Sequence, residues 1–259
     1  MGLLDELLGR FLPHTSNPDD YADVQSMFGR ATVYDSELEG EPLRVLDIEG
    51  TWQSASYMDE RWADLAFPYH RTFDLAFNAP ITIRRALMLG GGALSYPKHV
   101  VVQTDSQVEV VEIDPVITEL AEEWFFLDRL TSEQRARLHV THAEALAYIE
   151  QAAGEGASFD LVVNDLFAAE KQAIAFMGAR GAELLNRVLT PEGIYVANVV
   201  SAIKGRKARP LRMVKEALGT VFSQIEVISF GEDEPCIPDN TVVFATNGHY
   251  SLGEVLSSS

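Results

Sequence analysis

Three groups of residues in this chain have the types and spacing of a site for a nucleoside-containing ligand. Gly90, Gly91 and Gly92 follow directly on an apolar run, and glycines let a backbone approach a ligand closely and adopt positive φ angles. Glu112 ends the next apolar run, where a carboxylate can accept hydrogen bonds from a ribose diol. Asp165 ends a third apolar run. The order of strand, glycine turn, strand and acid predicts an α/β cofactor site.

These residues require a sheet that brings the ends of separate strands together. From residue 81 the sequence alternates short apolar runs with segments of helical periodicity, which is typical of a parallel sheet with helices on both faces. Ligands bind such sheets at the carboxyl ends of the strands, and His142 falls there together with the residues above. The predicted strands are 84–89, 109–113, 138–141, 159–163, 194–200, 225–229 and 241–246.

The segments between these strands carry helix signals. Asp114 is a suitable N-cap, and Pro115 fits the first turn of the helix that follows. No helix is predicted between the last two strands, so we expect them to pair antiparallel. The predicted helices of this region are 115–127, 143–151, 178–189 and 207–222.

The first part of the chain has a different pattern. Residues 28–56 are rich in β-formers and turns, and Gly40 and Gly50 mark turns of a small antiparallel sheet. Residues 62–77 look helical, with Pro68 as an interruption or a start, and residues 1–10 look like a surface helix. We therefore expect an N-terminal helix and small β-rich domain over 1–78, and a nucleoside-binding α/β domain over 79–259.

Composition excludes several classes of protein. The net charge is -19, and nucleic acid binding needs a basic face, so we expect no nucleic acid partner. This acidity serves solubility, or it attracts cationic substrates. Cys236 is the single cysteine, which suits a reducing cytoplasm. No apolar run approaches a membrane span and the N-terminus lacks the pattern of a signal peptide, so a cytoplasmic protein without membrane contact is expected.

Other chemistry finds little support in the sequence. The six histidines and the one cysteine lack metal-ligand spacing, so we predict no metal. Ser95 follows the glycines without a nucleophile-elbow sequence around it. The basic cluster at 204–209 reads as a solvated helix start, with a contact to a phosphate or a partner as the alternative.

The chain resembles the spermidine synthase family, the polyamine aminopropyltransferases. The resemblance covers about residues 29–246 and rests on 50–53 (Gly-Thr-Trp-Gln), 87–92 (Leu-Met-Leu-Gly-Gly-Gly), 111–115 (Val-Glu-Ile-Asp-Pro), 159–165 (Phe-Asp-Leu-Val-Val-Asn-Asp) and 190–198. It implies a small β domain in front of a Rossmann-like methyltransferase domain. It also implies transfer of an aminopropyl group from decarboxylated S-adenosylmethionine to an amine such as putrescine.

The resemblance assigns roles to residues of this sequence. Asp165 would orient and deprotonate the acceptor amine, which arrives protonated because its pKa lies near that of lysine, about 10.4. Tyr69 would assist it, while His70 and Glu170 would bind the acceptor. The implied donor-binding residues are Gln53, Gly90, Gly91, Gly92, Glu112, Ile113, His142 and Glu144.

Several positions depart from the family pattern. Ala93 and Ala168 stand where the family carries aspartates that hold the donor amine and the polyamine, and Arg71 replaces an acid. Each lost carboxylate removes a charged hydrogen bond of about 1.5–3 kcal/mol. Either Glu144, Glu170 or the acidic run 232–234 replaces these carboxylates in the amine site, or the protein binds a different donor or acceptor, or it catalyses nothing.

These departures leave three interpretations of function. The first is a spermidine synthase-like aminopropyltransferase that uses decarboxylated S-adenosylmethionine and an amine acceptor. The second is an S-adenosylmethionine-dependent methyltransferase on the same scaffold, and the third is an inactive nucleoside-binding homologue. The resemblance also makes a homodimer the expected assembly.

Overall fold

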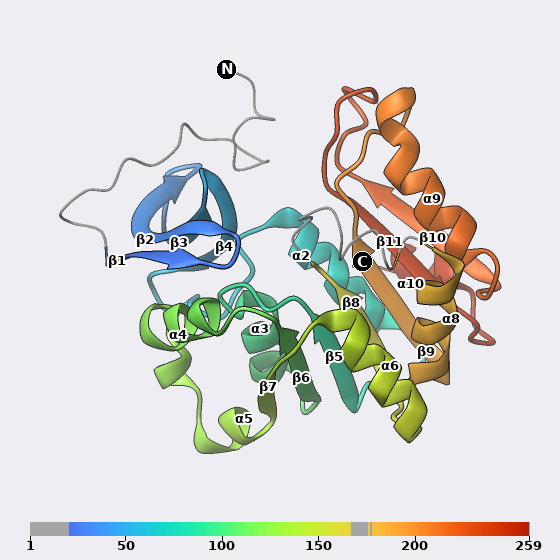
Figure 1. Ribbon diagram of the computed structural model, residues 1–259, viewed down its shortest axis with the longest axis horizontal. Helices are drawn as coiled ribbons and strands as arrows, with labels where there is room; N and C mark the ends of the chain where they lie inside the picture. Colours follow the sequence, from blue (N-terminus) through green and yellow to red (C-terminus); the bar gives the residue numbers. More distant parts are fainter. Residues whose placement is uncertain (1–20, 167–175, 177, 259) are drawn as a thin grey trace.

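Two β-sheets of different size organise the protein, whose computed structural model describes residues 21–166, 176 and 178–258 (Figure 1). The small sheet is antiparallel with the strands in chain order. Two-residue turns, Glu39-Gly40 and Glu49-Gly50, join its last three strands, and all four turn residues have positive φ, as type I′ turns require. The strands are β1 (Ala22–Ser26), β2 (Gly29–Leu38), β3 (Glu41–Ile48) and β4 (Thr51–Tyr57).

The large sheet has seven strands in the order β10-β11-β9-β8-β5-β6-β7. All neighbouring pairs from β9 to β7 are parallel, whereas β11 runs antiparallel to both β9 and β10. The strands are β5 (Arg85–Leu89), β6 (Gln107–Glu112), β7 (Leu138–His142), β8 (Phe159–Asn164), β9 (Leu189–Asn198), β10 (Gln224–Ser229) and β11 (Thr241–Thr246).

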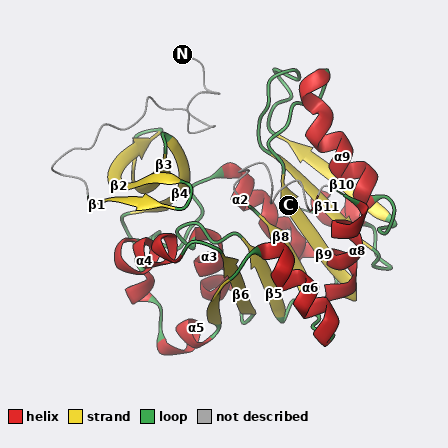
Figure 2. Cartoon of the chain, viewed as in Figure 1, coloured by secondary structure: helices red, strands yellow, loops and turns green. Residues whose placement is uncertain are grey.

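Helices cover both faces of the large sheet (Figure 2). One apolar core lies between α3, α4, α10 and the sheet, and it continues into the small sheet through Val33 and Leu46. The second core lies between the opposite face and α6, α8 and α9. The helices are α2 (Pro68–Phe73), η1 (Asp74–Asn78), α3 (Ser95–Gln103), α4 (Pro115–Trp124), η2 (Leu127–Arg129), α5 (Ser132–Ala136), α6 (Ala145–Glu155), α8 (Ala179–Val188), η3 (Arg206–Ala208), α9 (Arg209–Leu218) and α10 (Leu252–Ser257).

The predicted fold class is confirmed: a small antiparallel sheet precedes a Rossmann-like sheet with helices on both faces. The predicted cap is also present, because the Asp114 carboxylate accepts a hydrogen bond from Val116 N at 3.0 Å at the start of α4. Its other oxygen accepts from Met27 N at 2.6 Å, so this cap also ties the small sheet to the large domain.

Some predicted boundaries were wrong. Residues 62–77 do not form one helix, since the chain tightens into a 3-10 turn after Phe73, but the predicted possible start at Pro68 is confirmed, because α2 begins there. Helix α3 was missed, since Pro97 and a run of valines give it little helical signal and its N-cap, Leu94, is left-handed. The short α5, with a capping box from Thr131, and the terminal α10 were missed as well.

Two further expectations concern the N-terminal segment and membranes. The helix expected over 1–10 lies outside the described residues. Among the helices of the described ranges, none is long and apolar enough to cross a membrane.

A buried lysine joins the two domains behind the glycine turn. Lys98 of α3 is 1% exposed, and its Nζ lies 2.9 Å from both Ser56 Oγ of β4 and the Phe125 carbonyl at the end of α4. Burial, together with the nearby Arg129 charge, lowers the pKa of Lys98 to about 7. Near neutral pH the folded protein therefore holds this side chain partly as a neutral amine.

We predict that Lys98 makes stability rise with pH between about 7 and 9. In this range the unfolded chain binds a proton at Lys98 that the folded protein releases, so the free energy of unfolding increases by up to about 1.4 kcal/mol per pH unit. Lys98→Met should flatten this slope in urea denaturation experiments. Lys215→Met, at an exposed position of α9, should keep it, and equal slopes for all three proteins would contradict the assignment.

Candidate functional site

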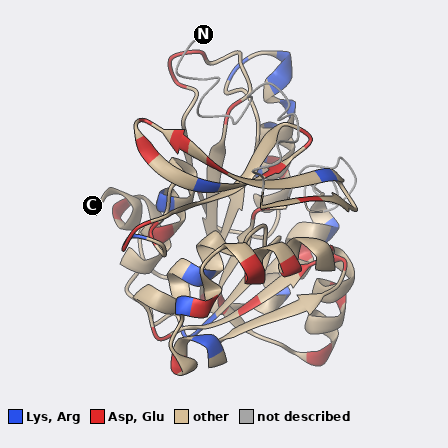
Figure 3. Cartoon of the chain, turned by 90° about the vertical axis from the view of Figure 1, so that its left-hand side faces the viewer, with Lys and Arg blue, Asp and Glu red and all other residues tan. Residues whose placement is uncertain are grey.

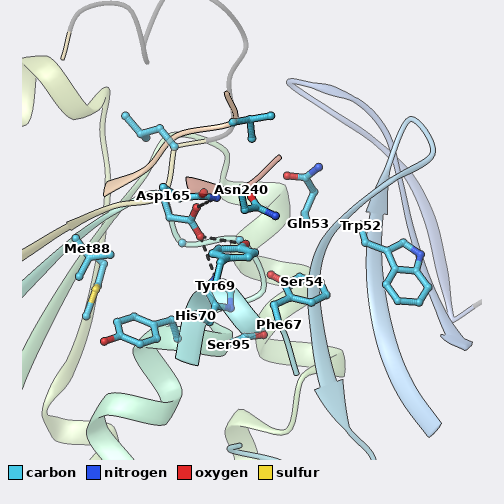
Figure 4. A pocket seen from close by; sticks show the side chains of 18 of the residues that line it. Trp52, Gln53, Ser54, Phe67, Tyr69, His70, Met88, Ser95, Asp165 and Asn240 are labelled. Carbon is cyan, nitrogen blue, oxygen red and sulfur yellow. Dashed lines mark hydrogen bonds and ion pairs between the residues drawn. The ribbon is translucent and has the colours of Figure 1, made fainter. Parts of the chain in front are cut away.

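A cavity of about 590 Å³ lies at the carboxyl ends of the parallel strands, between the large sheet and the small one (Figure 4). Its lining includes Gly90 after β5, Glu112 at the end of β6 and Asp165 after β8. Gln53 of β4 lines the cavity on the side of the small sheet, and Tyr69 of α2 lies next to Asp165. The cavity therefore brings together residues that are widely separated in the sequence.

The glycine turn fits this place because it has no side chains. Gly90 has φ +87°, and a Cβ added there would lie 2.6 Å from the carbonyl oxygen of Asp165. Gly92 has φ +48°, and its Cβ would lie 2.7 Å from Ser54 Oγ. Any other residue at these two positions would clash with the neighbouring strand ends, so the turn lies close against both.

Ser54 also fixes the end of the turn. Its hydroxyl accepts a hydrogen bond from Ala93 N at 2.9 Å, and Ser95 Oγ donates to the Ala55 carbonyl at 3.2 Å. Both contacts are buried, and both link β4 to the start of α3. These two hydrogen bonds fix the end of the glycine turn against β4 of the small sheet.

Glu112 is held in place by two backbone amides. Its Oε2 accepts from Gly91 N at 2.9 Å, and its Oε1 accepts from Asp114 N at 3.0 Å. The residue is only 7% exposed, yet it lines the cavity. Each carboxylate oxygen can accept a second bond, so Glu112 presents a rigid pair of acceptors beside the turn, as a ribose diol requires.

Asp165 is the centre of a polar cluster on the other side of the turn. His70 Nε2 lies 2.9 Å from Asp165 Oδ2, and since a carboxylate only accepts, this nitrogen carries the hydrogen. The Tyr69 hydroxyl donates to the same oxygen at 3.4 Å, while Asn198 Nδ2 donates to Oδ1 at 3.1 Å. Three donors thus orient a carboxylate whose side chain is still 25% exposed.

The charge of this cluster affects Tyr69. Burial raises the pKa of the Tyr69 hydroxyl well above its usual value, and the adjacent Asp165 carboxylate adds to this effect. Tyr69 therefore stays protonated over the physiological pH range and acts as a hydrogen-bond donor, not as a base.

The other donor-binding residues predicted from sequence occupy different places. Gln53 and Ile113 line the cavity. His142 is exposed and shares a 3.1 Å hydrogen bond with Thr118, outside the lining. Glu144 caps α6 by accepting from Leu146 N and Ala147 N, and the neighbouring Ala143 and Ala145 line the cavity instead.

The positions that depart from the family pattern lie mostly outside the cavity. Arg71 is exposed and donates to the Leu65 and Ala66 carbonyls, so it does not face an acceptor as its sequence position suggested. Ala93 is fully buried in the core. The acidic run 232–234 is exposed and absent from the lining, whereas Ala168 and Glu170 lie outside the described residues.

Two residues of the site were missed from the sequence. Asn198 ends β9 and could have been found by the same rule that identified Asp165, namely that polar residues at carboxyl ends of parallel strands meet. Ser54 had no such signal, because its role depends on how the small sheet packs on the turn. Among the described residues, no group of three acidic, histidine or cysteine side chains could hold a metal ion.

The chain belongs to the spermine/spermidine synthase family. The model of the spermine/spermidine synthase domain matches residues 67–244, which is more than half of the chain. These residues contain the whole large sheet apart from the last two residues of β11, and they include the turn, Glu112 and Asp165.

Curated relatives fall into two kinds of transferase. A polyamine aminopropyltransferase of Vibrio vulnificus is 29% identical over 155 residues, which are 59% of this chain and 50% of that protein. A Xenopus laevis eEF1A lysine and N-terminal methyltransferase is 27% identical over 143 residues, 52% of this chain and 20% of that protein. The chain thus spans about half the length of the first relative and a fifth of the second.

Solved structures share the fold. A probable spermidine synthase of Corynebacterium glutamicum superposes with a TM-score of 0.75 at 20% identity, covering 89% of this chain and 81% of that one. A spermidine synthase in complex with the transition state analogue AdoDATO gives 0.69 at 16% identity, with 91% and 76% covered. Human methyltransferase-like protein 13 in complex with SAH gives 0.59 at 24% identity, with 73% and 87% covered.

We predict that Glu112→Gln weakens binding of methylthioadenosine at least about tenfold. The amide would turn an NH2 group toward one of the two backbone donors and would lose the charged hydrogen bonds to a diol, each of about 1.5–3 kcal/mol. Isothermal titration calorimetry measures the change. Glu119→Gln, at an exposed position of α4, is the control, and an unaltered dissociation constant in the Glu112 variant would count against the ribose role.

Proposed function

We propose that this protein transfers an aminopropyl group from decarboxylated S-adenosylmethionine to an amine acceptor. The observation that carries the proposal is the position of Asp165, whose carboxylate lines the same cavity as the glycine turn and Glu112. A nucleoside on Glu112 and an amine on Asp165 would lie on opposite sides of one turn. The match to aminopropyltransferases of the family supports the choice of donor.

The residues present fit an adenosyl ligand. The glycine turn exposes backbone to the cavity, and Glu112 supplies two fixed acceptors for a diol. When bound, the sulfonium of the donor supplies an electrophilic carbon with a good leaving group. Ile113, Ala143 and Ala145 give the same cavity an apolar lining, which suits a base.

Asp165 prepares the amine for attack. An alkylamine is protonated at neutral pH, so the carboxylate first binds it as a cation and then takes up a proton. The freed lone pair forms the new N–C bond while the C–S bond breaks with its electron pair going to sulfur. Tyr69, His70 and Asn198 keep the carboxylate in one orientation during this step, since all three donate to it.

Methyl transfer to an amine is the second candidate. It is favoured by the methyltransferase relatives. The same Asp165 cluster would serve this reaction, because both reactions need a neutral amine next to a sulfonium. The two candidates differ only in the donor they select.

We predict that Asp165→Asn reduces kcat by about 10²–10⁴-fold, as expected for loss of a general base. The amide keeps the shape of the side chain but neither takes up a proton nor attracts a cation. The dissociation constant of methylthioadenosine should change by less than about twofold, because Asp165 lies across the turn from Glu112. Asp105→Asn, a variant of an exposed acid outside the cavity, is the control. Unchanged turnover in Asp165→Asn would remove this residue from the mechanism.

We predict that methylthioadenosine and decarboxylated S-adenosylmethionine stabilise the protein more than S-adenosylmethionine and S-adenosylhomocysteine do. A ligand at 100 times its dissociation constant should raise the free energy of unfolding by about 2.7 kcal/mol, which thermal denaturation detects easily. The reverse preference would select methyl transfer. Stabilisation by none of the four would contradict both candidates.

A further inference from the structure

The charges that line the cavity divide it into two unlike ends. Among the described lining residues the carboxylates are Glu112 and Asp165, and the one lysine or arginine is Lys207. Glu112 is occupied by backbone donors on the nucleoside side. We call the region beyond Asp165 the acceptor end, which is formed by Asn198, Val200, Lys207, Ile237 and Asn240.

The backbone of Lys207 is held firmly at this end. Its carbonyl accepts hydrogen bonds from Ala202 N and from Ser201 Oγ, both at 3.3 Å. Ser201 in turn is paired with Asp239 through two backbone hydrogen bonds of 3.0 and 3.1 Å. The side chain of Lys207 is exposed, and none of the ion pairs found among the described residues includes it.

Lys207 belongs to a basic segment of an otherwise acidic protein, and the acidic run 232–234 lies beside that segment, because the Pro235 carbonyl accepts from Ile203 N at 2.9 Å and from Lys204 N at 2.7 Å. Residues 204–212 contain five of the 20 Lys and Arg residues of the chain and no Asp or Glu. Blue and red segments lie together at the top of Figure 3, at the height where α9 lies in Figure 1. A second ammonium group at the acceptor end would meet repulsion there, whereas an anion would be attracted.

The stretch between Asp165 and Lys207 is partly apolar. Val200 is 52% exposed and Ile237 is 41% exposed, and both line the cavity. Pro210 and Pro238 lie in the same lining. Such a surface suits an aliphatic chain, which would cover these side chains when bound.

We infer that the acceptor carries its reactive amine at one end of an aliphatic chain and an anionic group, such as a carboxylate, at the other. The amine would lie at Asp165, the chain against Val200 and Ile237, and the anion at Lys207. This inference rests on the proposed function, because it assigns the acceptor of the same transfer. It distinguishes the site from one built for a diamine, which needs a carboxylate at both ends.

The test compares γ-aminobutyrate, putrescine and butylamine, which share a four-carbon chain and differ in the group opposite the amine. With the preferred sulfonium donor, kcat/KM for γ-aminobutyrate should exceed that for putrescine at least about tenfold, with butylamine between them. Lys207→Glu should reverse this order. Lys215→Glu changes the net charge equally at a position outside the lining, so it should leave the order unchanged.

Binding of the same three amines, measured by thermal denaturation with saturating methylthioadenosine, separates this inference from the proposed function. A preference for γ-aminobutyrate that is lost in Lys207→Glu would support the inference even if no amine is alkylated, an outcome that would contradict only the transfer. A preference for putrescine, or an order that Lys207→Glu does not change, would overturn the inference and leave the transfer intact.

Discussion

The close approach of Gly90 to Asp165 is the constraint on which the site depends. A Cβ at residue 90 would lie 2.6 Å from the Asp165 carbonyl oxygen, and Asp165 N donates to the Leu89 carbonyl at 2.9 Å. The ends of β5 and β8 can therefore lie side by side only if the turn starts with glycine. This contact brings the glycine turn within one strand spacing, roughly 4.8 Å, of the backbone that carries the Asp165 carboxylate. Transfer between two ligands needs such proximity, because orienting the reacting atoms supplies much of the rate.

The small sheet contributes to the site through packing and hydrogen bonds. Ser54 accepts from the backbone at the end of the turn, and the Asp114 carboxylate, at the start of α4, accepts from Met27 in the first hairpin. The apolar core continues from one sheet to the other. Because the Ser54 contact is buried and the core is shared, the small sheet and the turn should respond to a ligand as one unit, in contrast to two domains joined only by a linker.

The acidic residues that line the cavity differ from the other acidic residues of the chain in how they are held. The two carboxylates in the described part of the lining, Glu112 and Asp165, are both fixed by protein donors, which lowers the freedom of each to turn toward water. Most of the other acids contribute to the net charge of -19 without entering the site. Lys207, the one lysine or arginine in the described part of the lining, has the opposite sign at the acceptor end, so an anionic group beyond the amine would meet a cation there. Net charge left two readings of the acidity open, solubility and attraction of cationic substrates.

The alternation of strands and helices, the turn residues and the strand-end acids were all readable from the sequence, because each depends on local periodicity or on backbone conformation at a few residues. Gly90, Glu112 and Asp165 were found in this way, and all three line the cavity. The roles of His142, Glu144 and Arg71 were not readable, since each lies near the site in sequence while its side chain bonds elsewhere. Asn198, at the end of β9, follows the same strand-end rule as Asp165, whereas Ser54 and Lys207 join the site only through packing of the two sheets and of η3. Tertiary structure decided these positions, because side chains that meet across strands, sheets and loops have no common period along the chain.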